Sequence, residues 1–167
     1  MDIINTNFIR LNQVSVEELI NKKGVYVLWS YDAWTKPSYV GEGMVLERII
    51  SHVKSSDKPF NKGMGGIVTL FDNDHPARAK RNGEIVELTL LRVASVLGVS
   101  PRHNNSSGKS ISIFKRGENH NTVRINFSGW HPLWWGVKIN RTARITWKYI
   151  DDYDGWQITE MPWRRRR

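Results

Sequence analysis

The fold is decided by the stretch from residue 24 to residue 52. It begins with Gly24-Val25-Tyr26-Val27-Leu28-Trp29 and continues, after an interval, with Tyr39-Val40-Gly41. Apolar and β-branched residues dominate the first segment, and Lys36-Pro37-Ser38 marks a turn before the second. We expect the two segments to pair as a hairpin, with a helix over residues 45–54 directly after it.

Side chains alternate between the two faces of a strand, which assigns the residues of the first segment to different sides of the sheet. Tyr26 is expected on the face of Leu28, and Val25 and Val27 on the other. Tyrosine therefore lies on a different side from the two valines.

In the helix that follows, Arg48 and His52 are four residues apart and are neighbours on one side. A separate apolar side is expected from the rest of the pattern, namely Leu46, Ile49, Ile50 and Val53. Two phenols, a guanidinium and an imidazole could then converge on one place.

These residues together resemble the GIY-YIG nuclease superfamily. Gly24-Val25-Tyr26 and Tyr39-Val40-Gly41 match its two tyrosine motifs with Val in place of Ile. Arg48 and His52 match its helix arginine and the histidine one turn later, whereas Glu42 departs from the usual small or basic residue. The resemblance covers residues 15–104. It implies an α+β fold, with a small, mostly antiparallel central sheet flanked by helices at 16–21, 45–54 and 84–97.

The last of these helices also has its own signals. Its apolar residues recur at helical spacing at Ile85, Leu88, Leu91, Ala94 and Val96. Gly98 is expected to end it. Glu84 and Glu87 lie in its first turn, where negative charge suits the helix dipole.

The resemblance gives the end of this helix a functional meaning. In the family, one glutamate of this helix holds a single divalent metal, and Glu87 matches it because it precedes Leu90 and Leu91; Glu84 is the alternative. The run Pro101-Arg102-His103-Asn104 resembles the family's Pro-x-x-Asn ending. It places Asn104 beside the site, with Asn105 as its alternative.

The resemblance further implies metal-dependent hydrolysis of a phosphodiester bond. Tyr39 or Tyr26 acts as the general base, with a pKa lowered by nearby cations. Arg48 clamps the scissile phosphate, and His52 assists it or relays a proton. Glu87 holds Mg²⁺, or Mn²⁺ in its place, with waters completing the shell. Asn104 orients water or backbone.

Composition limits the choice of partner. The 167 residues include 25 Lys and Arg against 16 Asp and Glu, a net charge of +9 that favours a polyanion. Cysteine is absent, the N-terminus lacks the layout of a signal peptide, and no apolar run could span a membrane. We therefore expect a cytoplasmic protein without a membrane partner.

Residues 106–167 form a β-rich, Trp- and Arg-rich extension, expected to pack on a catalytic domain of residues 1–105. Strands are expected at 110–114, 123–127, 137–139, 144–150 and 156–159, with a hairpin turn at Asp154-Gly155. The candidate nucleic-acid-binding residues are Trp134, Trp135, Arg141, Arg144, Lys148, Arg164 and Arg165. The alternative is that the tryptophans fill a hydrophobic seam and that the arginine tail is a disordered end.

The function expected from this sequence is that of a metal-dependent DNA endonuclease, such as a small restriction or mobile-element enzyme. The first alternative is a non-catalytic nucleic-acid-binding protein on a degenerate GIY-YIG scaffold. The second is an unrelated α+β protein whose basic tail binds RNA or another acidic partner. DNA is the expected partner and RNA the alternative. The sequence does not determine whether the protein forms a homo-oligomer.

Overall fold

The structure is a computed structural model, and it describes residues 1–30, 39–54, 64–71, 74–98, 101, 114, 121–132 and 142–162. The chain is α+β, as expected from the sequence. None of the described helices is long and apolar enough to cross a membrane.

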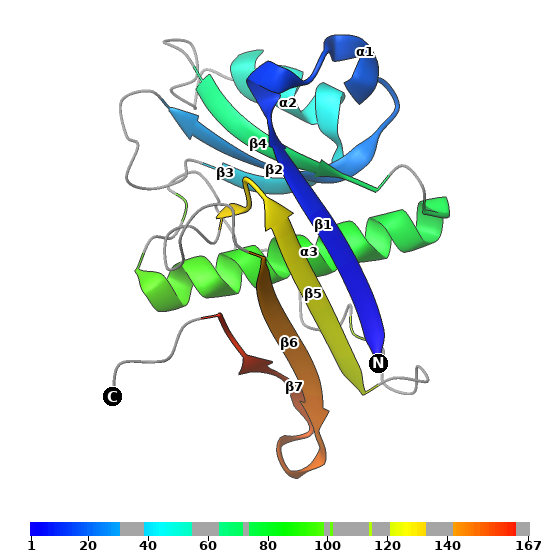
Figure 1. The fold of residues 1–167 in the computed structure, drawn as a ribbon, viewed down its shortest axis with the longest axis vertical. Helices are drawn as coiled ribbons and strands as arrows, with labels where there is room; N and C mark the ends of the chain where they lie inside the picture. Colours follow the sequence, from blue (N-terminus) through cyan, green and yellow to red (C-terminus); the bar gives the residue numbers. More distant parts are fainter. Residues whose placement is uncertain are drawn as a thin grey trace.

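One curled sheet of seven strands organises these residues, in the order β3-β2-β4-β1-β5-β6-β7 (Figure 1). All neighbours are antiparallel except β1 and β5, which are parallel. The strands are β1 (Asp2–Arg10), β2 (Lys23–Ser30), β3 (Tyr39–Met44), β4 (Met64–Leu70), β5 (Thr122–Gly129), β6 (Ala143–Ile150) and β7 (Gly155–Glu160). The sheet is larger than the small central sheet expected, because β5, β6 and β7 continue it.

Helices cover the two faces of this sheet differently. The short α1 (Val16–Leu19) and α2 (Val45–Lys54) lie on one face, over β2, β3 and β4. The long α3 (Pro76–Leu97) lies on the other and crosses the strands of both halves (Figure 1). The expected pairing of residues 24–29 with residues 39–41 is confirmed as the β2–β3 ladder.

The two-sided character of β2 is also confirmed. Tyr26 and Leu28 pack in the small cluster under α1 and α2, whereas Val25 and Val27 pack in the larger cluster around α3. The alternation of side chains along a strand produces this division.

Burial of the middle of α3 on every side distinguishes it from the amphipathic helix expected. Residues 85–91 are all buried, so there is no single apolar stripe, and Val96 is exposed. A helix segment that is buried all round needs apolar neighbours on every side, and those described include residues of the strands of the sheet and Phe114. The helix also begins at Pro76 and not at residue 84, because His75 caps it through Ala77 N–H and proline is tolerated at the first position.

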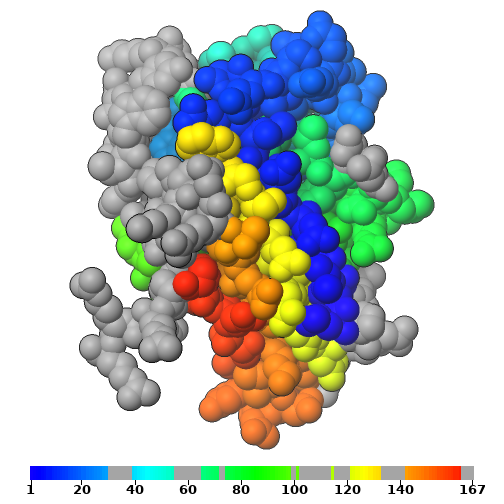
Figure 2. Space-filling view, viewed as in Figure 1, coloured from blue at the N-terminus to red at the C-terminus, as the bar shows by residue number. Residues whose placement is uncertain are grey.

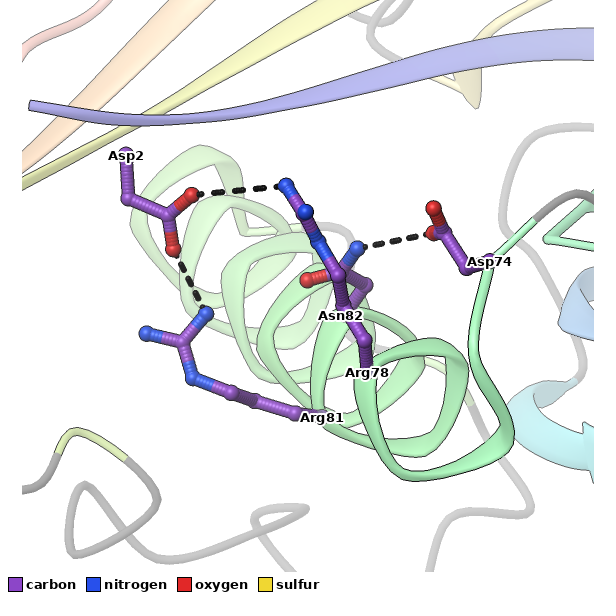
Figure 3. A network of polar contacts seen from close by, with 5 residues as sticks. All are labelled: Asp2, Asp74, Arg78, Arg81 and Asn82. Atoms are coloured by element: carbon purple, nitrogen blue, oxygen red, sulfur yellow. Dashed lines mark hydrogen bonds and ion pairs between the residues drawn. The ribbon is translucent and has the colours of Figure 1, made fainter.

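Polar contacts fix the first half of α3 to the start of β1. The Asp2 carboxylate accepts from Arg81 Nη1 at 2.7 Å and lies 3.9 Å from Arg78 Nη2 (Figure 3). Asn82 Nδ2 donates to Asp74 at 3.0 Å, just before the helix begins. These contacts hold the polar part of α3 under the sheet, where apolar packing alone would not specify its position.

Most of the other local signals are reproduced. Ser15 and Glu18 form a reciprocal capping box, although α1 ends at Leu19 and not at residue 21. Gly98 ends α3 in the left-handed conformation. The β6–β7 turn passes through a 3-10 turn at Asp151–Tyr153 before Asp154-Gly155. Strands expected at 110–114 and 137–139 lie outside the described residues, apart from Phe114, which is buried and stacked on Trp156.

A buried hydrogen-bond chain joins α3 to the C-terminal strands. Trp147 Nε1 on β6 donates to Thr89 Oγ1 at 2.8 Å, and Thr89 Oγ1 donates to the Ile85 carbonyl at 2.7 Å. Both side chains are almost fully buried. This chain links the helix that carries Glu87 to a strand of the C-terminal segment.

We expect Thr89→Val to lower the free energy of unfolding by about 1–3 kcal/mol, because the variant keeps the shape and leaves a buried indole N–H without its acceptor. Urea unfolding followed by tryptophan fluorescence measures this change. Thr159→Val removes a long hydrogen bond of 3.4 Å to the Thr146 carbonyl at an exposed position, and it should change the free energy of unfolding by less than about 0.5 kcal/mol. Equal stability of Thr89→Val and the unmodified chain would show that the link contributes nothing.

Candidate active site

The β2–β3 hairpin places two phenol rings side by side. Tyr26 pairs with Gly41 and Leu28 pairs with Tyr39, so both tyrosines project from one face. Their rings are stacked, with centroids 6.1 Å apart and planes 17° apart. A side chain at Gly41 would overlap the Tyr26 hydroxyl and the Tyr39 ring, so glycine is required between them.

His52 of α2 completes this aromatic group. Its Nε2 lies 3.0 Å from the Tyr26 hydroxyl, and its ring centroid is 4.1 Å from that of Tyr39. The imidazole is 6% exposed and faces the sheet together with Ile49. The prediction that Leu46, Ile49, Ile50 and Val53 form the apolar side of α2 is therefore wrong in part. Ile50 and Val53 are exposed, because the helix turns Val45, Ile49 and His52 toward the sheet.

Arg48 lies at the edge of this group. Its side chain is exposed and passes over Gly43, where its Nε would be 3.5 Å from an added Cβ. The positive φ of Gly43, 122°, turns β3 into α2 at this point. Arg48 is close enough to lower the pKa of both phenols, so its charge reaches the two rings.

Glu87 reaches the site from α3, on the other side of the sheet. It is 8% exposed, and its charge acts on both Tyr26 and Tyr39. Glu87 and not Glu84 is among the causes of both pKa shifts, so of the two candidates Glu87 is the one whose charge acts on the tyrosines. β3, which carries Tyr39, is an edge strand of the sheet.

Glu42 is a second carboxylate at this edge that sequence reasoning did not assign. It lies against Gly83 of α3, with its Cβ and Oε2 each 3.6 Å from the position of an added Cβ. Gly83 is one turn before Glu87, and the Glu42 charge also acts on both phenols. Its position directly after Tyr39-Val40-Gly41 was the signal that could have identified it.

The pKa values of both tyrosines shift upward, opposite to the expectation. Burial is the largest cause for Tyr26, and the charge of Tyr39 adds to it; Glu87 and Glu42 raise its pKa further. Burial and then Glu87 raise the pKa of Tyr39. Arg48 opposes these shifts without cancelling them. With the protein's own charges, both phenols are therefore protonated near neutral pH.

The donor atoms at this edge suit a hard cation, although they are few. Among the described residues, no group of three or more His, Asp or Glu side chains could hold a metal. Mg²⁺ usually keeps several waters and takes only one or two carboxylates together with substrate phosphate. Glu87 fits that role, and Glu42 is a further carboxylate on the α3 side, against Gly83.

The remaining candidate residues are not part of this group. Arg144 and Lys148 lie on β6, at the other end of the sheet. The rest fall outside the described residues: Asn104, Asn105, Trp134, Trp135, Arg141, Arg164 and Arg165. The group brought together therefore consists of Tyr26, Tyr39, Arg48, His52 and Glu87.

Comparison with known proteins adds no relative. No family model, no curated protein and no solved structure matches the chain. The assignment of a function therefore depends on the geometry at the β3 edge.

The opposing charges of Glu87 and Arg48 should shift the pKa of Tyr39 in opposite directions, and this can be tested by spectroscopy. In a titration followed by tyrosinate absorbance, the Tyr39 signal is the difference between the unmodified chain and Tyr39→Phe. Glu87→Gln should lower the pKa of Tyr39, because it removes a negative charge, and Arg48→Met should raise it. Glu84→Gln, with the same charge change on the same helix, should leave it in place.

The same shifts predict how stability depends on pH. Each phenol has a higher pKa in the folded than in the unfolded chain, so the unfolded chain loses its protons first as the pH rises. The free energy of unfolding should therefore fall above pH about 10, and it should fall less in Tyr26→Phe. If the free energy of unfolding fell equally with pH in Tyr26→Phe and in the unmodified chain, the buried position of the Tyr26 phenol would be contradicted.

Proposed function

We propose that this protein is a metal-dependent endonuclease that hydrolyses phosphodiester bonds in DNA. The observation that carries the proposal is the convergence of two phenols, an imidazole, a guanidinium and a carboxylate from β2, β3, α2 and α3 at one sheet edge. Their types supply the base, the phosphate clamp and the metal ligand that phosphodiester hydrolysis needs.

Tyr39 is the phenol best placed to act on substrate. It is half-buried, whereas Tyr26 is 1% exposed and its hydroxyl already contacts His52 Nε2. A general base must reach the attacking water, and Tyr39 reaches solvent. Tyr26 and His52 lie behind it and position its ring.

Arg48 and Glu87 provide the charges that this chemistry requires. The exposed guanidinium of Arg48 suits a bidentate contact with a phosphate and favours the ionised form of Tyr39. Glu87 would hold Mg²⁺, and Glu42 is a further carboxylate whose charge also acts on both phenols. The bound ion would supply positive charge next to the phosphate and the phenols. Because both phenols have raised pKa values, such cations are needed for Tyr39 to accept a proton.

One observation favours the alternative of a nucleic-acid-binding protein without catalysis. Burial raises the pKa of both tyrosines, and a phenol that stays protonated cannot act as a base. In that case the same residues would be a packed cluster, with Arg48 as a phosphate contact. Cleavage assays separate the two functions.

Loss of the Glu87 carboxylate is the first test. In a plasmid-nicking assay with Mg²⁺, and with EDTA as the negative control, Glu87→Gln should reduce cleavage by about 10²-fold or more. DNA binding should persist, because the variant removes a negative charge near the phosphate. Glu84→Gln is the matched control. Normal cleavage by Glu87→Gln together with loss of cleavage in Glu84→Gln would identify Glu84 as the metal ligand instead.

The two phenols should behave differently when only the hydroxyl is removed. Tyr39→Phe should reduce single-turnover cleavage by about 10²-fold or more, as expected when a general base is removed. Tyr26→Phe should reduce it less, because it removes a contact to His52 and not the base. Both variants keep ring packing, and circular dichroism checks their fold. Full activity in both variants would show that the two tyrosines contribute only to packing.

A further inference from the structure

Among the described residues, no element covers the face of the sheet opposite α3 over its C-terminal half. Core side chains of β5 and β6, such as Ile125 and Ile145, point toward α3, so the alternate residues point away from it. No described helix lies on this half, and Figure 2 shows β1, β5, β6 and β7 at the surface. We call this surface the open sheet face; it carries Asn5, Arg124, Asn126, Arg144, Lys148 and Glu160.

The open sheet face lies on the same side of the sheet as the active-site tyrosines. Tyr26 pairs with Val68 on β4, and Val68 pairs with Ile9 on β1. Asn5 shares the face of Ile9, since both positions are odd along one strand. Helices α1 and α2 cover the part between, so the open sheet face is separate from the tyrosines on this side of the sheet.

Positive charge predominates on this face. Arg124, Arg144 and Lys148 lie on neighbouring positions of β5 and β6, where Thr122 pairs with Lys148 and Asn126 with Arg144. Glu160 is the only acidic residue among the described outward positions of these strands. It lies 3.9 Å from both arginines. Ion pairs at this distance between partly exposed groups contribute little, so the guanidinium groups remain available to another anion.

Neutral donors extend the row of basic groups. Asn126 Nδ2 donates to Asn5 Oδ1 at 2.9 Å, which aligns the two amides across β1 and β5. A shallow groove of about 520 Å³ begins next to Asn126 and Arg144 and is bordered by Glu160, Met161 and Pro162. Amide, hydroxyl and guanidinium groups in such a row match the oxygen atoms of a sugar-phosphate backbone.

We propose that the open sheet face binds the phosphate backbone of duplex DNA outside the cleavage site, through Arg124, Arg144 and Lys148. The choice of DNA as the occupant rests on the proposed function. A duplex fits better than a single strand, because no aromatic side chain is among the described outward residues and single-strand binding relies on stacking. Such contacts are independent of base sequence.

Binding to a fluorescein-labelled duplex, measured by anisotropy in EDTA at several salt concentrations, tests the proposal without cleavage. Arg124→Ala/Arg144→Ala should reduce the slope of log K against log salt by about two, because each arginine neutralises one phosphate. Lys80→Ala/Arg92→Ala is the matched control, since it removes the same charge from exposed positions of α3. Its slope should remain that of the unmodified chain.

Two further variants test whether the charge of these side chains, and not a change in the fold, determines the slope. Arg124→Lys/Arg144→Lys keeps the charges and should retain the slope, and Glu160→Gln should strengthen binding by removing a like charge. An unchanged slope in the alanine double variant, or an equal decrease in the α3 control, would overturn the proposal. Tighter binding of single-stranded DNA or of duplex RNA, with the same dependence on Arg124 and Arg144, would also overturn duplex DNA as the occupant.

The outcome is separate from that of the nuclease proposal. If the slope falls as expected while the unmodified chain fails to nick DNA, the open sheet face stands as a DNA-binding surface and the nuclease proposal fails. If the chain nicks DNA and the slope does not change, the open sheet face fails and the active site stands.

Discussion

The burial of the middle of α3, at residues 85–91, is the constraint on which the rest of the structure depends. Residues 85 to 91 of this helix are all buried, and their apolar side chains belong to one core cluster with residues from both halves of the sheet. β1 makes the curl continuous, because it pairs with β4 on one side and with β5 on the other. Glu87 is held within this enclosed helix, so its position is fixed by the same packing that stabilises the fold.

The site at the β3 edge follows from this arrangement. Tyr26, Tyr39 and His52 belong to the α2 side of the sheet, and Glu87 belongs to the α3 side. On the edge strand β3, Gly41 leaves room for the rings of Tyr26 and Tyr39, and Gly43 lies next to Arg48. This enclosure raises the pKa of both phenols, so cations are a requirement of the proposed chemistry and not an addition to it.

The sequence predicted the parts of this structure that depend on neighbouring residues. The hairpin, the bounds of α2, the capping box at Ser15 and the stop at Gly98 all have local signals. The role of β1 could not be predicted, because its partners Val123 to Gly129 lie about 120 residues away. The first half of α3 was missed because Arg78, Arg81 and Asn82 are fixed by polar contacts and not by apolar periodicity. The upward pKa shifts of the two tyrosines could not be predicted, because they result from burial of the rings and a sequence motif does not indicate burial.

The central claim is that Glu87 and the tyrosines form one metal-binding catalytic site. Anomalous diffraction from crystals soaked in Mn²⁺ tests it most directly, with a Glu87→Gln crystal soaked in parallel. A peak at about 2.0–2.2 Å from the Glu87 carboxylate, on the side of Tyr39 and missing from the variant, is the expected result. Absence of a peak at Glu87, at a Mn²⁺ concentration that supports cleavage, would contradict the claim.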